Sequence, residues 1–286
     1  MATKTLTITR VLDAPVDMVF KAWTDPKQMA AWWSPKYFTN PVCELDVRPG
    51  GAIRIDMTGP DGTVYPMSGE FKEVEAPNRL VFTAIAFKGA DGKALLENLN
   101  TITFENQGGK TKLTVHVVVL KSEPGTETAL ASMDEGWSQS LDKLGALIKS
   151  APLIIERTYN APIERVWSAL TNPDEVRQWY FTDFKAEVGY QFTFTGGKNG
   201  KNYVHLFKIT EVVPGKKLSY TWRYEGVKGD SAVTFELFPE GDRTRLKLTH
   251  TGLETFPASN PDLARDRFSG GWTQIIGASL RAFLEK

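Results

Sequence analysis

Residues 10–33 read RVLDAPVDMVFKAWTDPKQMAAWW, and residues 157–180 read RTYNAPIERVWSALTNPDEVRQWY. Aligned without a gap at an offset of 147, the two stretches are identical at eight of 24 positions, including Trp32. The similarity returns near the end of each half, where Gly136-Trp137 matches Gly271-Trp272. A repeat of this length is best explained by duplication, so we interpret the chain as two copies of one domain.

The length of the repeat sets the domain boundaries. Each copy has about 140 residues, a normal size for a domain with a single hydrophobic core. The copies join at Lys149-Ser150-Ala151-Pro152, where a predicted helix ends and a predicted strand begins. We therefore predict one domain over residues 1–150 and a second over residues 151–286.

Both copies show the same order of predicted elements. Each begins with a strand of alternating apolar and polar residues, Thr5–Leu12 and Leu153–Tyr159. Proline at a first helical position and an Asp or Asn cap before it then predict two short helices. These signals are Pro15, Asp25-Pro26, Pro162 and Asn172-Pro173. After the helices, apolar and polar residues alternate along segments that are separated by turn residues. This pattern predicts six antiparallel strands.

Each copy closes with a long amphipathic helix. The apolar stripe of the first is Met133, Trp137, Leu141, Leu144 and Ile148, and that of the second is Phe268, Trp272, Ile276, Leu280 and Phe283. A sheet must cover its apolar face, and this helix is the only long amphipathic element in each copy. The predicted fold class is therefore α+β, with a curved antiparallel sheet wrapped around a long C-terminal helix in each copy.

The motifs of both copies resemble the activator of heat-shock protein 90 ATPase homologue domain. In the second copy they are Arg-x-x-x-Ala-Pro-x-x-x-Val-Trp (157–167), Thr-Asn-Pro-x-x-x-x-x-Trp (171–179), Thr-His-Thr-Gly (249–252) and Gly-Gly-Trp before the last helix. This family belongs to the START-like, or SRPBCC, helix-grip superfamily, which includes the birch-pollen allergen. The resemblance implies two tandem helix-grip domains, each with a sheet–helix cavity that often holds an apolar or aromatic ligand. In some branches the domain regulates the chaperone ATPase instead.

The first copy departs from this pattern at one strand. It has Val117-Val118-Val119 where the Thr-His-Thr-Gly run would fall. His116 is one position out of phase with His250, so strand alternation predicts that His116 faces solvent and His250 faces inward.

Composition excludes several classes of partner. Lys plus Arg and Asp plus Glu number 34 each, so the net charge of zero gives no general attraction to nucleic acid or anionic lipid. Residues 1–10 lack the apolar run of a signal peptide, and no apolar stretch of 18 residues occurs. We therefore expect a cytoplasmic protein with no nucleic-acid or membrane partner. The single cysteine, Cys43, forms no intramolecular disulfide and is interpreted as a half-buried strand residue.

The sequence offers little catalytic chemistry. Its three histidines, His116, His205 and His250, lie in predicted strands without metal-ligand spacing. No Gly-x-Ser-x-Gly elbow or phosphate-binding loop is present. Alternating charges from Glu44 to Asp56 are expected to form cross-strand ion pairs on a solvated face. We therefore predict no catalytic residue, no metal site and no cofactor.

Inward-facing aromatic residues form the candidate ligand site. Tyr and Trp carry polar groups that a packed core avoids unless they have partners, which favours a cavity with His250 as polar anchor. Two alternatives stay open: the rings simply fill a core, and His250 is a core histidine with its hydrogen bonds satisfied, which is the better supported role for it. The candidates are Trp179, Phe192, Phe194, Tyr220, Trp222, Phe235, His250, Trp272 and Ile276 in the second copy, and Trp32, Ile55, Phe82, Phe104, Trp137 and Leu141 in the first.

Three classes of function follow. The first is non-catalytic binding of a small hydrophobic or aromatic molecule in the sheet–helix cavity, as a carrier or sensor. The second is a protein-binding module related to chaperone activators; these are expected to carry a docking domain before the first strand, whereas this sequence begins with that strand. The third is an aromatase/cyclase-like enzyme, disfavoured by the missing acid–base pair. Ligand binding is expected in the second copy, because Ala84 of the first stands where the second has Trp222.

Overall fold

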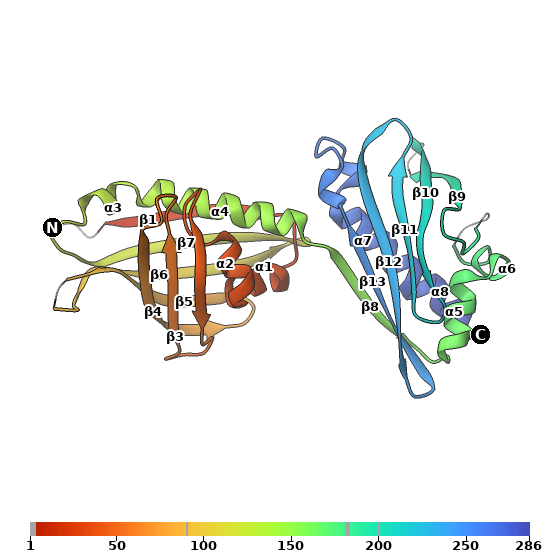
Figure 1. Cartoon of the computed structure of the whole chain (residues 1–286), viewed down its shortest axis with the longest axis horizontal. Helices are drawn as coiled ribbons and strands as arrows, with labels where there is room; N and C mark the ends of the chain where they lie inside the picture. Colours follow the sequence, from red (N-terminus) through yellow and green to blue (C-terminus); the bar gives the residue numbers. More distant parts are fainter. Residues whose placement is uncertain (1–3, 90, 181–183, 199–200) are drawn as a thin grey trace. The chain divides into compact units, whose positions relative to one another are not determined.

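The structure is a computed structural model that describes residues 4–89, 91–180, 184–198 and 201–286. It divides into two compact units, Met1–Lys149 and Ser150–Lys286, hereafter the first and second units. Each unit combines one antiparallel sheet with several helices, so the predicted α+β class with two tandem helix-grip domains is confirmed (Figure 1).

The first unit contains a seven-stranded sheet in the order β1-β7-β6-β5-β4-β3-β2. Its strands are β1 (Thr5–Leu12), β2 (Thr39–Leu45), β3 (Ala52–Thr58), β4 (Val64–Glu75), β5 (Arg79–Lys88), β6 (Ala94–Gln107) and β7 (Lys110–Ser122). Its helices are α1 (Val16–Thr24), α2 (Pro26–Trp32), α3 (Glu127–Ala131) and α4 (Met133–Ser150). Consecutive strands β2 to β7 pair as a meander, and β1 joins its end beside β7.

Helix α4 covers the apolar face of this sheet, along which it runs in Figure 1. The stripe predicted from its sequence is buried at Met133, Leu141, Leu144 and Ile148. Trp137 is half-buried and packs against the core with its ring stacked on that of Trp23 at 6.2 Å. The predicted phase of the helix is therefore correct.

The second unit repeats the plan with a six-stranded sheet in the order β8-β13-β12-β11-β10-β9. Its strands are β8 (Leu153–Tyr159), β9 (Gln191–Lys198), β10 (Lys201–Val213), β11 (Lys217–Tyr224), β12 (Val227–Glu240) and β13 (Arg243–Thr251). Its helical segments are α5 (Ile163–Thr171), α6 (Pro173–Val176), η1 (Leu253–Thr255), η2 (Pro261–Leu263), α7 (Arg265–Gln274), η3 (Ile275–Ser279) and α8 (Leu280–Leu284).

The prediction of six strands after the short helices is wrong for the second unit. Five strands follow α6, and the described residues 184–190 contain no counterpart of β2. This segment turns instead: the Tyr190 N–H donates to the Glu187 carbonyl at 3.0 Å. Phe184 is buried, and its ring lies 5.6 Å from that of Phe192 on the edge strand β9.

The closing helix of the second unit is also not one regular α-helix. A π-helical segment, η3, interrupts it between α7 and α8. The stripe Phe268-Trp272-Ile276-Leu280 has three successive spacings of four, and each such step turns the stripe by about 40° around an α-helix. The wider turn of a π-helix offsets this drift. All four side chains, and Phe283 after them, are consequently buried.

Contacts repeated in both units explain several identities between the two copies. The indole N–H of Trp32 donates to the Ala22 carbonyl at 2.8 Å, as Trp179 does to Ala169 at 2.9 Å. The hydroxyl of a buried threonine donates to an alanine carbonyl in both units as well, from Thr111 to Ala14 and from Thr244 to Ala161. Each pair satisfies buried polar groups, which explains why the same residues stand at both places.

Separate expression of residues 1–149 and 150–286 is expected to give two folded proteins. The core cluster of the first unit lies between Leu12 and Ile148, and that of the second lies between Leu153 and Leu284. Each half thus carries a complete core of its own. Urea unfolding followed by circular dichroism should show one cooperative transition for each half, and a non-cooperative signal from either would contradict this expectation.

Candidate functional site

The second unit contains a cavity of about 150 Å³ between strand β11 and helix α7. Two side chains of β11, Trp222 and Tyr224, form one wall, and the first turns of α7 form the other. Most of the lining is apolar, and two charged side chains complete it. The lining residues are Trp222, Tyr224, Asp262, Arg267, Phe268, Gly271, Trp272 and Ile275.

The cavity borders a cluster of aromatic rings around Trp222. The centre of this ring lies 5.4 Å from that of Trp272 and 6.0 Å from that of Phe268, both at nearly perpendicular angles. The Phe256 ring, from the segment after β13, stacks on Phe268 at 5.7 Å and meets Tyr224 at 5.5 Å. Edge-to-face contacts of this kind add about 0.5–1.5 kcal/mol each to the burial of the rings. The wall of the cavity is therefore rigidly held.

His250 is fully buried beside these rings, with both ring nitrogens engaged. The Trp272 indole N–H donates to its Nδ1 at 3.0 Å. Nδ1 is thus an acceptor, which places the proton of the neutral ring on Nε2, 2.9 Å from the Ser231 hydroxyl oxygen. The Ser231 hydroxyl in turn donates to the Trp222 carbonyl at 2.8 Å. Burial, reinforced by the charge of Arg265, lowers the pKa of His250 to about 3, so the ring is neutral near pH 7.

Nδ1 of His205 is buried without a hydrogen-bond partner among the described residues; the buried indole N–H of Trp222 forms no bond of good geometry but lies close enough to the Tyr224 hydroxyl to act on its pKa. Leaving a buried polar group unpaired costs about 1–3 kcal/mol. His205 is half-buried among the rings of Phe194, Phe207, Trp222 and Tyr224, and burial lowers its pKa to about 4. Burial raises the pKa of Tyr224 to about 12, an effect that the adjacent Trp222 N–H opposes.

The charged lining residues differ in their partners. Asp262 accepts hydrogen bonds from Tyr203 at 3.0 Å and Lys201 at 3.2 Å, and these bonds lower its pKa. Arg267 is exposed on α7, and no carboxylate in the described part of the chain lies within ion-pairing distance of its guanidinium group. The charge of Arg267 nevertheless contributes to the lowered pKa of Asp262, so the two charged lining residues partly compensate each other.

A second cavity in this unit, of about 10 Å³, lies deeper between the sheet and α6. It has room for one water molecule at most. The hydroxyls of Tyr180 and Tyr220 lie 3.1 Å apart beside it, and burial raises the pKa of both. This region is packed core, with Trp179, Tyr220 and Phe235 among its lining residues.

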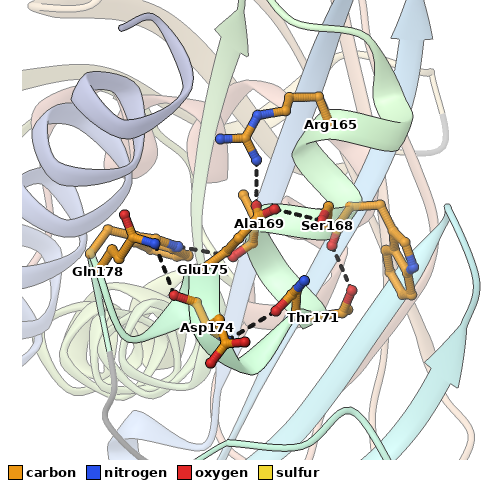
Figure 2. A network of polar contacts seen from close by, with 10 residues as sticks. Arg165, Ser168, Ala169, Thr171, Asp174, Glu175 and Gln178 are labelled. Carbon is orange, nitrogen blue, oxygen red and sulfur yellow. Dashed lines mark hydrogen bonds and ion pairs between the residues drawn. The ribbon is translucent and has the colours of Figure 1, made fainter.

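A polar network holds the corner between α5 and α6 (Figure 2). Arg165 forms an ion pair with one carboxylate oxygen of Glu175, and the Ser168 hydroxyl donates to the other at 2.9 Å. The Trp179 indole N–H reaches back to the Ala169 carbonyl. These bonds join the two short helices and thereby set the position of the Trp179 ring.

The candidate residues of the second unit occupy three different places. Trp222 and Trp272 line the 150 Å³ cavity, with His250 behind them, whereas Trp179, Tyr220 and Phe235 line the small one. Ile276 is fully buried, and its carbonyl accepts the Tyr159 hydroxyl at 2.7 Å. The edge-strand residues differ in burial: Phe192 is buried against Phe207 at 4.7 Å, and Phe194 is 36% exposed.

The candidate residues of the first unit belong to its hydrophobic core. Trp32, Ile55, Phe82, Phe104 and Leu141 are buried, and Trp137 is half-buried. The ring of Trp23 lies 4.6 Å from Trp32 and 6.1 Å from Phe104. Ala84 occupies the place of Trp222, and His116 lies on the outer face, where its Nδ1 meets the Thr7 hydroxyl at 2.8 Å.

Six residues lining the larger cavity were not proposed from the sequence as site residues. Tyr224 follows Trp222 by two residues on the same strand face, so alternation alone points to it. Arg267, Gly271 and Ile275 form a stripe with spacings of four, directly beside the core stripe that contains Phe268. Helix periodicity could therefore have pointed to Arg267, Phe268, Gly271 and Ile275. Asp262 lies in an irregular segment, where no periodic signal exists.

Within the described ranges, no group of three or more His, Cys, Asp and Glu side chains is arranged to hold a metal ion. Cys43 is half-buried on β2, and burial raises the pKa of its thiol to about 11. None of the described helices is long and apolar enough to span a membrane.

Comparison with protein families matches this repeated architecture. The profile of the family described as Activator of Hsp90 ATPase homolog 1-like protein matches residues 13–149 and, separately, residues 160–285. The chain belongs to this family. The membership confirms the resemblance seen in the sequence motifs and places the chain among ligand-binding or activator-type modules.

Several solved structures are similar to the chain. Ms6760 from Mycobacterium smegmatis is 29% identical, and the match covers 51% of this chain and 95% of that one with a TM-score of 0.44. NE0264 from Nitrosomonas europaea is 26% identical over 51% of this chain and 94% of its own, with a TM-score of 0.43. DynU16, a protein in the dynemicin biosynthetic locus, is 20% identical over 98% of this chain and 97% of its own, with a TM-score of 0.39. No curated protein matches the chain significantly.

Proposed function

We propose that the second unit binds a small aromatic molecule, non-catalytically, in the cavity between β11 and α7. The observation that carries the proposal is the cavity itself, with its aromatic walls and a volume of about 150 Å³. An apolar cavity of about this volume holds one benzene ring in another protein, whereas sites for drug-sized ligands measure roughly 300–1,000 Å³. The expected ligand therefore has a single ring.

The same volume argues against an aromatase/cyclase-like reaction, because a folded polyketide of several rings does not fit. The polar groups argue in the same direction. His250 is neutral, with both nitrogens occupied, and Asp262 is held by Lys201 and Tyr203. Neither is placed as a free acid or base beside the cavity. A carrier or sensor role agrees better with this arrangement than catalysis does.

Gly271→Leu is expected to block the cavity without harming the fold. Gly271 lines the cavity, and a Cβ added there meets no atom within 4 Å. Replacing a helical glycine by a better helix former stabilises by about 0.5–1 kcal/mol. We expect the wild type to bind benzamide, a neutral single-ring probe, in a titration followed by NMR, and the variant to lose at least tenfold in affinity.

Gly270→Leu is the matched control. Gly270 lies next to Gly271 on α7, a Cβ added there also meets no atom within 4 Å, and it does not line the cavity. Its affinity for benzamide should equal that of the wild type. Absence of benzamide binding by the wild type would refute the proposal and favour the protein-binding, activator-type role that the family also includes.

A further inference from the structure

We infer that the free edge of strand β1 pairs with β1 of a second copy of this chain, so that the first units of two copies share one continuous antiparallel sheet. Strand β1 lies at the end of the seven-stranded sheet and pairs on one side only, with β7. The pairing concerns the first unit and does not depend on the ligand proposed for the second.

The pairing with β7 determines which backbone groups of β1 reach the free edge. The Val119 N–H donates to the Lys4 carbonyl at 3.0 Å, and hydrogen bonds at every second residue then direct the even-numbered residues of β1 toward β7. The backbone groups of the odd-numbered residues point to the free edge: Thr5, Thr7, Thr9 and Val11. Within the described ranges, none of these four N–H groups has an acceptor, and only the Thr9 carbonyl has a donor, the exposed Arg10 side chain at 3.3 Å. The edge of β1 therefore offers a nearly complete row of backbone donors and acceptors.

Two other edges of the sheets are protected against such pairing. Directly before β8, the strand of the second unit equivalent to β1, Pro152 has no N–H, and its carbonyl accepts a bond from Arg265 at 2.8 Å. Further along β8, the Thr158 carbonyl accepts a bond from Arg281 at 3.0 Å. Strand β2, at the other end of the first sheet, contains Pro41 and an irregularity in its pairing. Prolines, bulges and charged side chains commonly keep edge strands from pairing. The first five residues of β1, TLTIT, contain neither proline nor charge.

The side chains of β1 favour a second copy of the same strand as the partner. With a two-fold axis at Ile8, the outward residues form hydrogen-bonded pairs, Thr7 with Thr9 and Thr5 with Val11 of the second copy. These four β-branched side chains are exposed on the outer face of the sheet, and cross-strand pairs of this kind stabilise sheets. On the inner face, the half-buried Ile8 meets its own copy.

This register also keeps like charges apart. It places Arg10 opposite Leu6 of the second copy. Lys4, which precedes the strand, falls opposite Leu12. A register shifted by two residues would instead set Lys4 against Arg10, which is unfavourable, and leave Val11 with no opposite residue in β1. The first register therefore pairs all four outward residues without an opposing pair of like charges.

Sedimentation equilibrium of the full-length protein tests the pairing. We expect a concentration-dependent equilibrium between monomer and dimer, because one strand from each copy buries less surface than a tight dimer needs. The average mass should rise above the monomer value of 31.9 kDa as the concentration increases. A mass that stays at the monomer value up to millimolar concentration would overturn the inference.

Thr7→Pro should weaken the dimer at least tenfold, because it removes an N–H that points to the free edge and breaks no bond to β7. Ile154→Pro is the matched control, since Ile154 is the equivalent residue of β8 at the offset of 147 and is 49% exposed. Its dimer should be as strong as that of the wild type. A dimer that survives Thr7→Pro, or that both variants weaken equally, would overturn the role of β1.

Single cysteines test the register without any proline. In a Cys43→Ala background, Ile8→Cys brings two thiols to a non-hydrogen-bonded pair whose Cα atoms lie about 4.5 Å apart, within reach of a disulfide. Leu6→Cys is the control, because its two thiols lie about 13 Å apart along the paired strands. We expect oxidised glutathione to cross-link two copies of Ile8→Cys at least tenfold faster than two copies of Leu6→Cys. Equal rates of cross-linking would overturn the proposed pairing.

Discussion

Trp272→Ala is expected to lower the free energy of unfolding of the second unit by about 5 kcal/mol. Deleting a buried tryptophan commonly costs about 3–5 kcal/mol, and Trp272 is only 1% exposed. The substitution also removes the indole N–H that donates to Nδ1 of His250. Because the imidazole is fully buried, its unpaired nitrogen adds a further cost of about 1–3 kcal/mol. Urea unfolding of the full chain, followed by a probe in the second unit, measures the effect.

Trp272→Phe separates the two causes. It retains a ring against Trp222 and Phe235, whose centres lie 5.4 and 5.8 Å from that of Trp272. It still removes the donor to His250, so we expect a loss of about 2–3 kcal/mol. If Trp272→Ala cost less than 2 kcal/mol, the helix stripe would not support the core as described. Unfolding of the first unit should be unaffected by either variant.

The repeat in the sequence predicted most of the fold. The identities Trp32/Trp179 and Ala14/Ala161 belong to hydrogen bonds that recur in both units, so a feature visible in the sequence corresponds to a repeated contact. The stripe from Phe268 to Phe283 was likewise visible as a helical period. Its three spacings of four also contained the signal for the π-helical segment η3, since a regular α-helix would turn these residues apart.

The candidate site was less accessible to sequence reasoning. Strand alternation placed His250 inward, but only the geometry shows that Trp272 and Ser231 satisfy both of its nitrogens. Alternation likewise did not show that Tyr220 and Trp222, on the same strand face, border different cavities. The volume of a cavity depends on how side chains from several elements meet, which no single periodic pattern records.

The two units differ at equivalent positions of their last strands. Val117 of β7 pairs opposite Leu6, and His250 of β13 pairs opposite Leu153. The first unit thus has an apolar side chain where the second has the buried imidazole. This substitution gives the second unit alone a buried titratable group on that strand, with consequences for its stability in acid.

Acidification from pH 7 to pH 5 is expected to destabilise the second unit by about 2–4 kcal/mol. Burial lowers the pKa of His250 to about 3 and that of His205 to about 4, while a histidine of the unfolded chain titrates near 6.5. Between these values the unfolded state binds more protons than the folded state, so stability is fully present above pH 6.5 and falls as the pH drops toward the folded pKa values. His250 contributes about 2 kcal/mol between pH 6.5 and 5, and half-exposed His205 contributes less.

His250→Gln tests the origin of this acid sensitivity. The glutamine amide supplies one acceptor for the Trp272 N–H and one donor for Ser231 but does not titrate. The variant should be less stable than the wild type at pH 7, because the shape of its side chain differs from that of the imidazole. Its stability should nevertheless lose more than half of the dependence on pH. The first unit serves as an internal reference, since its one histidine, His116, lies on the outer face beside Thr7. Unfolding of the two separate halves at pH 7, 6 and 5 gives the change in the free energy of unfolding with pH for each half. If this change were the same in His250→Gln as in the wild type, His250 would not be the group that titrates.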